Sequence, residues 1–371
     1  MNNLKIAIIG TRGIPAAYGG FETFAEEVSI RMVKKGFEVV VIGDSSLNYK
    51  ESYYKGVRIL KSEISKPSNP LGFYGDSMKI AKKEGASFII MCGVGGSLLI
   101  PFYRNKNTII AVNPDGLGFK RDKYVWWKKA IFFSQYLVAS IVPSHIICDS
   151  EGIKNYYSKI FKRKKNVTVI EYGTYLNKFN NTKFDEDTLN KYDLDIIPHK
   201  YHLVVSRLEP ENNVEIIIQG YLKTPKKFPL IIVGNTNTKH SQELIKYKSE
   251  HVKFVGGIYE RDKLMILRAA SLSYLHGHSV GGTNPSLLEA MGSKNICICH
   301  DNIFNREVMN NNSLFFKDVN EVSERIDFIE NILNSMIIDK YKIDTIDRAK
   351  EYYSWENITN KYLKLAINVT K

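Results

Sequence analysis

Residues Leu4–Thr23 read LKIAIIGTRGIPAAYGGFET. The run Leu4–Ile9 is apolar, as in buried parallel strands, and a helical pattern begins after the glycines. Glycines at such a turn let backbone amides approach an anion at a helix N-terminus. Their spacing fits neither a dinucleotide-binding fingerprint nor a Walker loop, which argues against an NAD-dependent enzyme. The turn is therefore a candidate anion-binding loop, with a purely structural tight turn as the alternative.

The same order of strand and helix repeats along the chain in two series. Each series predicts a doubly wound α/β lobe with a parallel sheet covered on both faces. Ligands of such sheets bind beyond the carboxyl ends of the strands, so we expect two lobes facing across a ligand-binding cleft. The expected strands of the first series are Leu4–Ile9, Glu38–Ile42, Ser87–Cys92, Thr108–Val112, His145–Cys148 and Val167–Ile170. Those of the second are Tyr201–Ser206, Leu230–Val233, Val252–Val255, Leu272–Leu275 and Ile296–Cys299.

The predicted linker between the lobes is residues 176–200, a polar stretch rich in Asn, Asp and Lys. It separates an N-terminal domain, residues 1–175, from a C-terminal domain, residues 201–354. The last segment reads as a helix interrupted around Ser354. We expect its final part, residues 355–371, to pack back on the N-terminal domain.

The composition is that of a globular chain. Its 371 residues are 44% hydrophobic and 25% charged, so disorder is excluded as a description of the whole. No window offers about 18 uncharged apolar residues, and the N-terminus lacks the features of a signal peptide. We therefore expect a cytoplasmic protein. The four cysteines all lie in apolar runs and are expected to be buried free thiols.

The net charge of +13 lies entirely in the first half of the chain. Residues 1–170 hold 26 basic and 13 acidic side chains, whereas residues 171–371 hold 26 of each. This asymmetry indicates an anionic partner, which is nucleic acid, a membrane surface or a polyanionic small molecule. No nucleic-acid-binding motif is present, which argues against the first. A solvated basic surface without a partner is the alternative.

Residues 119–129, FKRDKYVWWKK, mix cations with aromatic rings and precede the apolar run Ala130–Val142. Such rings suit the headgroup layer of a bilayer, where each basic residue near an anionic surface adds about 1 kcal/mol. The segment predicts peripheral contact with the inner face of the cell membrane. An ordinary helix with a partly buried Trp is the alternative. The predicted membrane-contact residues are Lys120, Arg121, Trp126, Trp127, Lys128 and Lys129.

Two stretches of the second lobe carry candidate ligand-binding residues. Residues 203–213, LVVSRLEPENN, place Arg207 just past a strand, where a guanidinium can clamp a phosphate with two hydrogen bonds. Residues 275–291, LHGHSVGGTNPSLLEAM, read as strand, glycine turn and helix. The amides of Gly281–Asn284 could hold a phosphate or sugar hydroxyls, and Glu289 could accept a hydrogen bond from a ribose.

These three stretches resemble glycosyltransferase family 4, the retaining transferases of the GT-B fold. The resemblance is greatest to the bacterial capsule and O-antigen rhamnosyltransferases, and it spans both lobes. It implies that Arg207 contacts the donor diphosphate and that Glu289 holds the ribose. The implied donor-binding residues are Gly19, Gly20, Arg207, Gly281, Gly282, Thr283, Asn284 and Glu289. The implied acceptor-binding residues are Arg12, Tyr18, Phe21 and Glu22.

The chain departs from the family pattern at two positions. The Lys that commonly follows the Arg by five residues is Asn212, and the first Glu of the Glu-x7-Glu motif falls on Gly281. The first change leaves Arg207 and backbone amides to neutralise the phosphates. The second removes a carboxylate that usually lies near the donor sugar, so neither departure tells us which sugar is carried.

Asp115 follows the expected strand Thr108–Val112 and is a second candidate catalytic residue. A carboxylate there could orient the acceptor hydroxyl or stabilise positive charge on the sugar ring. The alternative is an Asx-turn residue before a glycine. His276 and His278 have the spacing of a metal pair but lack a third ligand, so we read them as loop histidines and expect no metal cofactor.

The sequence thus predicts a metal-independent, retaining hexosyltransferase. Its donor would be a nucleoside diphosphate sugar and its acceptor a lipid-linked saccharide, with dTDP-rhamnose as the donor suggested by the resemblance. UDP-glucose, UDP-galactose and UDP-N-acetylhexosamine remain open as donors. So do a GT-B epimerase or hydrolase that needs no acceptor, and a noncatalytic sugar-nucleotide-binding component of a polysaccharide assembly complex.

Overall fold

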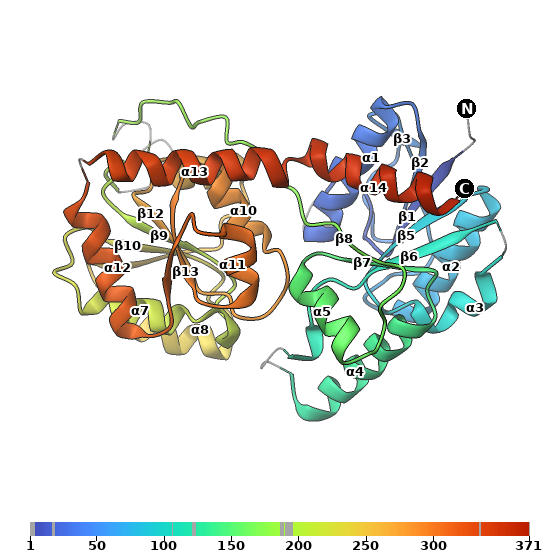
Figure 1. Ribbon diagram of the computed structural model, residues 1–371, viewed down its shortest axis with the longest axis horizontal. Helices are drawn as coiled ribbons and strands as arrows, with labels where there is room; N and C mark the ends of the chain where they lie inside the picture. Colours follow the sequence, from blue (N-terminus) through green and yellow to red (C-terminus); the bar gives the residue numbers. More distant parts are fainter. Residues whose placement is uncertain are drawn as a thin grey trace. The chain divides into compact units, whose positions relative to one another are not determined.

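The computed structural model describes residues 4–16, 19–105, 107–120, 124–185, 189, 196–333 and 335–370. The chain folds into two compact units. Among the described residues the first unit comprises 4–120, 124–173 and 355–370, and the second comprises residues from Thr174 to Ser354. Each unit is a helix-covered, mainly parallel sheet (Figure 1), which confirms the predicted pair of doubly wound α/β lobes.

The sheet of the first unit has the strand order β3-β4-β2-β1-β5-β6-β7-β8. Among the described strands only the pair β3–β4 is antiparallel, and it forms one edge of the sheet. The strands are β1 Lys5–Ile9, β2 Glu38–Gly43, β3 Tyr53–Tyr54, β4 Val57–Lys61, β5 Phe88–Cys92, β6 Ile109–Asn113, β7 His145–Cys148 and β8 Val167–Val169.

The sheet of the second unit is entirely parallel, with the order β11-β10-β9-β12-β13-β14. The chain progresses outward from β9 in one direction and from β12 in the other. The strands are β9 His202–Val205, β10 Leu230–Val233, β11 Val252–Gly256, β12 Ser273–His276, β13 Ile296–His300 and β14 Leu314–Phe316.

Helices cover both sheets. In the second unit α7 packs against α12, while α10 packs against α13 on the other side of the strands (Figure 1). The helices of the first unit are α1 Gly20–Lys34, α2 Pro70–Lys83, α3 Ile100–Tyr103, α4 Trp126–Ile141, α5 Glu151–Lys159 and α14 Trp355–Thr370. Those of the second are α7 Val214–Leu222, α8 Lys239–Leu244, α9 Arg261–Ala269, α10 Pro285–Gly292, α11 Ile303–Met309, α12 Val319–Asn331 and α13 Met336–Tyr353. Four short 3-10 helices complete the described set: η1 Ser97–Leu99, η2 Gly118–Lys120, η3 Pro210–Asn212 and η4 Ile245–Tyr247.

Local capping explains where several helices begin. Asn69 caps α2 by accepting a hydrogen bond from the Gly72 amide, and Pro70 occupies the first helical position. Asn284 and Asn302 cap α10 and α11 in the same way, through amides that follow them. Such caps fix the loops that lead into these helices.

Three strands, β3, β4 and β14, lie outside the two expected series. β3 and β14 are short, and each ends its sheet, so their sequences lack a long apolar run. β4 is half-buried, with the alternating burial of a strand covered on one face. The periodicity of continuous apolar runs therefore missed all three.

The chain passes from the first unit to the second after Gly173, two residues before the predicted end of the N-terminal domain. The residues that follow pack on the second unit. The Asn177 side chain donates to the Met265 carbonyl at 2.7 Å and to Ser293 Oγ at 2.9 Å. Asn177, near the start of the predicted linker, is thus hydrogen-bonded within the second unit, and residues 186–188 and 190–195 of that linker lie outside the described residues. The long C-terminal helix breaks at Ser354, and α14 packs on α1 of the first unit (Figure 1).

Each sheet has a switch point, which is the place between two neighbouring strands from which the strand order proceeds towards opposite edges of the sheet. In the first unit this point lies between β1 and β5, and in the second between β9 and β12. Ligands of open parallel sheets bind beyond the carboxyl ends of the strands at such points. The three glycine- and arginine-containing stretches of the sequence follow β1, β9 and β12.

Candidate functional site

The loop that follows β9 presents Arg207 to solvent. The Asn212 side chain donates a hydrogen bond to the Arg207 carbonyl oxygen at 2.5 Å and is itself buried. Asn212 therefore fixes the backbone of the loop rather than presenting a cation. Of the two positions that carry a cation in the resembling family, only Arg207 does so here.

The loop that follows β12 is joined to the β9 loop by close backbone contact. Asn213 donates from its side chain to the Gly277 carbonyl at 2.7 Å. Ser279 donates to the Glu211 carbonyl from its amide at 3.0 Å and from Oγ at 2.9 Å. A Cβ atom on Gly277 would lie 2.1 Å from the Asn212 carbonyl oxygen, so only glycine allows this approach. The two loops thus form one rigid surface at the switch point.

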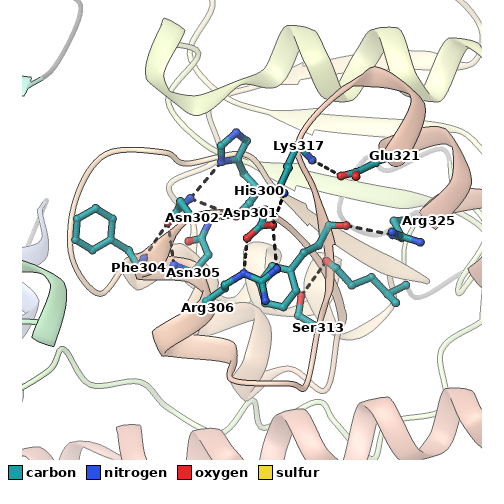
Figure 2. Close-up of polar contacts among 12 residues, drawn as sticks. His300, Asp301, Asn302, Phe304, Asn305, Arg306, Ser313, Lys317, Glu321 and Arg325 are labelled. Atoms are coloured by element: carbon teal, nitrogen blue, oxygen red, sulfur yellow. Dashed lines mark hydrogen bonds and ion pairs between the residues drawn. The ribbon is translucent and has the colours of Figure 1, made fainter.

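The end of β13 holds the β12 loop from its other side. Asn302 and Asn305 each donate from Nδ2 to the His278 carbonyl at 2.9 Å. Figure 2 shows Asn302 between His300 on one side and Phe304 and Asn305 on the other. Its Oδ1 accepts hydrogen bonds from the amides of Phe304 and Asn305, each at 3.0 Å. One side chain therefore caps α11 and anchors the loop.

Several buried polar groups at this switch point have no hydrogen-bond partner within the described part of the chain. They are Ser206 Oγ, both carboxylate oxygens of Glu211 and both ring nitrogens of His276. Glu211 is 6% exposed and His276 is 1% exposed. Buried polar groups are nearly always hydrogen-bonded, because an unpaired one costs about 1–3 kcal/mol. Their concentration at the ends of β9 and β12 indicates a site built for a polar ligand.

His276 lies at the end of β12, not in a loop as the sequence suggested. Burial lowers the pKa of His276 well below its ordinary value, and the neighbouring His278 adds to this effect. The ring is therefore neutral at physiological pH, with one nitrogen that donates and one that accepts. The rings of His276 and His278 stack, with centroids 4.4 Å apart.

The glycine turn before α10 is shaped as the sequence predicts. Gly281 has a φ of 133°, which side-chain-bearing residues rarely adopt, and no atom lies within 4 Å of the position a Cβ would take. Gly282 is half-buried and Thr283 is buried. Asn284 Oδ1 accepts from the Ser286 amide at 2.9 Å and begins the helix. The turn leaves open space beside the helix N-terminus.

Glu289 lies on α10, one turn beyond this loop, with its side chain 47% exposed. Its Oε2 forms an ion pair with the buried Arg268 at 2.6 Å. The carboxylate is therefore held in place at the surface. Nothing in the sequence pattern around Glu289 pointed to Arg268, which lies on α9.

In the first unit, the loop after β1 is braced by two carboxylates of α1. Glu22 Oε1 accepts from the Arg12 amide at 2.9 Å, and Glu26 Oε2 accepts from the Ala16 amide at 2.6 Å. Glu22 is buried, whereas Arg12, Gly19 and Gly20 are exposed. Phe21 is half-buried. Glu22 thus holds the loop, and the loop presents the exposed residues. Tyr18 lies outside the described residues.

Lys66 is a candidate that no pattern in the sequence would select. Its Nζ donates to the Gly10 carbonyl at the end of β1 and lies 5.7 Å from the centre of the Tyr74 ring. Lys66 lies in the irregular segment between β4 and α2, outside every motif. Its cation stands where β1 and β5 diverge.

Asp115 is exposed and has a left-handed backbone, with a φ of 63°. Its amide donates to Asn113 Oδ1 at 3.0 Å, and the Asn113 side chain donates to the Tyr362 hydroxyl of α14 at 3.2 Å. Asn113, rather than Asp115, forms the Asx turn. The Asp115 carboxylate is thereby placed at the solvent-facing end of β6.

All four cysteines are buried free thiols, as predicted. Burial raises the pKa of the Cys92, Cys148, Cys297 and Cys299 thiols, which keeps them protonated. They are not candidate nucleophiles. Within the described ranges, no group of three or more His, Cys, Asp or Glu side chains is arranged to hold a metal ion.

The aromatic segment lies on the surface of the first unit. Trp126 is 81% exposed and Trp127 is 49% exposed at the start of α4. Lys128 lies 5.2 Å from the Trp127 ring centre, and Lys120 lies 4.7 Å from that of Tyr156. Lys129 is half-buried, and Arg121 lies outside the described residues. None of the helices described is both long enough and apolar enough to cross a bilayer.

Two family models match the chain, one mainly in each unit. Residues 3–175 match a family described as a domain of unknown function, DUF1972. Residues 197–345 match the family "Glycosyl transferases group 1". The matched stretch includes Arg207, Glu211, Arg268, His276 and Glu289.

Individual proteins are also similar to this chain. An uncharacterised glycosyltransferase of Methanocaldococcus jannaschii is 24% identical over 263 residues, which are 67% of this chain and 66% of that protein. A sucrose-phosphate synthase from Thermosynechococcus elongatus has a similar fold, with a TM-score of 0.80 at 16% identity over 99% of each chain. So does an Anabaena protein, HepE, whose structure in complex with UDP-glucose has a TM-score of 0.73 at 15% identity over 99% of each chain. The fold is GT-B, and the matches support a glycosyltransferase of the group 1 type.

Proposed function

We propose that the chain is a metal-independent, retaining hexosyltransferase of glycosyltransferase family 4. It would move a hexosyl group from a nucleoside diphosphate sugar to a hydroxyl of a lipid-linked saccharide in bacterial surface polysaccharide synthesis. The observation that carries this proposal is the set of unpaired buried groups beside the exposed Arg207 at the β9–β12 switch point. A nucleotide sugar supplies both ligand chemistries that this site lacks, namely anionic phosphates for the guanidinium and hydroxyls for the carboxylate and imidazole.

The chemistry requires mainly charge stabilisation. The bond between the anomeric carbon and the diphosphate oxygen breaks, and a bond to the acceptor oxygen forms on the same face. The acceptor proton passes to the departing diphosphate oxygen, so no protein base is needed. Arg207 and the amides of the loop at Gly281 would stabilise the negative charge on the diphosphate. A well-aimed donor of this kind commonly contributes about 3–4 kcal/mol.

The donor sugar is open between dTDP-rhamnose, UDP-glucose, UDP-galactose and UDP-N-acetylhexosamine, and specific observations favour the first two. The resemblance to rhamnosyltransferases favours dTDP-rhamnose, and the UDP-glucose bound to the HepE neighbour favours UDP-glucose. Thermal unfolding of the protein with each nucleotide sugar separates them, because a ligand that binds only the folded state raises its stability. We expect one donor to raise the unfolding temperature by several degrees at a concentration of about 100 times its Kd. No shift with any nucleotide sugar would refute the proposal.

The first unit would bind the acceptor. The braced loop after β1 offers the side chains of Arg12 and Phe21 and the exposed backbone of Gly19 and Gly20. Asp115 would orient the acceptor hydroxyl or stabilise positive charge on the sugar ring. Donor turnover assayed with and without a lipid-linked saccharide tests this part. Equal consumption of the donor without acceptor would instead support a hydrolase or epimerase.

The exposed aromatic helix α4 would hold the protein at the inner face of the cell membrane. Its solvent-facing side carries Trp126, Ile131, Leu137 and Ile141, which are 81%, 51%, 42% and 67% exposed. The apolar side chains can enter the headgroup layer while the basic first unit attracts anionic lipid. Cosedimentation with vesicles that contain anionic lipid should exceed that with neutral vesicles, and replacing Trp126 and Ile141 with Ser should abolish it. Unchanged binding would exclude α4 as the contact.

A further inference from the structure

Arg268 is a charged residue in the interior of the second unit that no motif includes. It lies near the end of α9 and is 3% exposed. Its carbonyl accepts from Asn295 Nδ2 at 2.7 Å and from Ser271 Oγ at 2.9 Å, so its backbone is fixed. A buried guanidinium is costly unless an anion compensates it.

The compensating anion is Glu289. Arg268 Nη2 lies 2.6 Å from Glu289 Oε2, and in the described part of the chain this is the sole ion pair that Arg268 makes. The guanidinium side chain is 4% exposed, whereas that of Glu289 is 47% exposed. The pair therefore runs from the interior to the surface, with the cation fixed below and the carboxylate above it.

The ion pair occupies one carboxylate oxygen and leaves Glu289 Oε1 available to a ligand. A free Glu side chain on a helix samples several rotamers, and fixing it on binding costs about 0.5–1.5 kcal/mol. The bridge to Arg268 removes that freedom in advance. The arrangement is that of a preorganised hydrogen-bond acceptor beside the loop at Gly281.

We propose that Arg268 is a positioning residue, which fixes Glu289 so that its second oxygen accepts a hydrogen bond from a pentose hydroxyl of the donor nucleotide. This inference rests on the proposed function, because it assumes that a nucleotide binds at this site. Arg268 itself does not touch the ligand. Its contribution therefore depends on the presence of the pentose hydroxyls.

The test compares two nucleotides on wild-type and Arg268→Met protein. UDP carries pentose hydroxyls, and 2′,3′-dideoxyuridine diphosphate lacks them. We expect Arg268→Met to weaken UDP binding by about tenfold and dideoxy-UDP binding by less than about twofold, as measured by calorimetry. In the transferase assay the KM for the donor should rise while kcat changes little, because the lost contact is made equally in the ground and transition states.

Control variants keep the result interpretable. Arg31→Met removes an Arg–Glu pair on α1, with Glu27 as partner, and should leave both affinities unchanged. Arg268→Lys keeps the charge and should retain most of the UDP affinity. If Arg268→Met does not fold, the two single variants Glu289→Gln and Arg268→Lys replace it in the comparison. Glu289→Gln should then weaken the binding of UDP but not that of dideoxy-UDP.

Equal weakening of both nucleotides in Arg268→Met would overturn the inference, since a purely structural bridge has no preference for pentose hydroxyls. So would unchanged UDP affinity. If wild-type protein binds UDP and dideoxy-UDP equally well, Glu289 does not hold the pentose, and the inference fails while the proposed function stands. If wild-type protein binds dTDP but not UDP, dTDP and 3′-deoxythymidine diphosphate give the same comparison. If it binds neither UDP nor dTDP, the proposed function fails, and this inference fails with it.

Discussion

The two units present the same kind of sheet edge but differ in how its polar groups are satisfied. After β1, the carboxylates of Glu22 and Glu26 accept backbone amides, and Lys66 donates to the Gly10 carbonyl. After β9 and β12, the described side chains of Glu211 and His276 are buried without hydrogen-bond partners. Among the described residues, the loop after β1 has no unpaired buried side-chain group, whereas the loops after β9 and β12 have several.

This difference suggests that the two units bind ligand differently, although they share one architecture. A loop whose own carboxylates satisfy its amides is preorganised and costs little to hold open for an incoming ligand. An edge with unpaired buried groups is destabilised until a ligand supplies the missing bonds. We therefore expect the donor to interact mainly with the second unit and to stabilise it.

The largest effect expected to sharpen this contrast comes from Arg207→Ala. Loss of the exposed guanidinium should lower kcat by about 10²- to 10³-fold, because charge on the diphosphate is no longer stabilised. Lys246→Ala, which removes an exposed cation from the same unit, is the matched control and should leave kcat unchanged. Steady-state kinetics with saturating donor measures both. An active Arg207→Ala protein would remove this residue from the site.

Replacing Glu211 tests the unpaired edge directly. Glu211→Met removes a buried unpaired carboxylate, so the ligand-free protein should gain about 1–3 kcal/mol in free energy of unfolding. The same variant should lose most of the thermal stabilisation that the donor provides. Urea unfolding with and without donor measures both quantities. A less stable ligand-free variant would show that Glu211 has a structural partner.

Substituting one glycine in each unit compares the backbone strain that the two glycine loops tolerate. Gly19→Ala would place its Cβ 2.2 Å from Glu22 Oε2 at a φ of 109°, whereas Gly281→Ala at a φ of 133° meets no atom within 4 Å. Both substitutions strain the backbone by about 1–3 kcal/mol. Gly19→Ala should be the more destabilising of the two, because it also displaces the bracing carboxylate. Denaturant unfolding of both variants decides the order, and a larger loss for Gly281→Ala would contradict it.

The smallest expected effect is the pH dependence of stability that arises from His145, a buried residue of the first unit. Burial, with a contribution from Arg163, lowers the pKa of His145 to about 4. In the folded chain the His145 imidazole thus stays neutral, whereas in the unfolded chain it takes up a proton below about pH 6.5. The free energy of unfolding therefore falls as the pH drops from 6.5 towards 4. At pH 5 the loss should be on the order of 1 kcal/mol after solvent screening. His145→Asn should flatten this decline between pH 7 and pH 5, and an unchanged slope would contradict the assignment.

Continuous apolar runs identified most strands, because buried parallel strands carry their own signal. The strand order, and with it both switch points, comes from the structure. The runs Leu230–Val233 and His145–Cys148 match β10 and β7 residue for residue. Edge strands such as β14 and half-covered strands such as β4 lack that signal, and they were missed.

Site residues near glycine loops and strand ends could be selected from the sequence, as Arg207 and Glu289 were. Glu211, Arg268 and Lys66 could not, because their interest arises from burial or from contacts with distant segments. Arg268 and Glu289 are in contact although 21 positions separate them in the sequence, and Lys66 and Gly10 although 56 positions separate them. Such pairs are set by packing rather than by local pattern.

Hydrogen–deuterium exchange of the whole chain with and without UDP-glucose or dTDP-rhamnose tests the central claim most directly. We expect the bound donor to slow exchange mainly in residues 206–213 and 276–284, the loops that carry the unpaired groups. Protection confined to the loop at residues 10–20, or absent from both edges with a donor that binds, would contradict it.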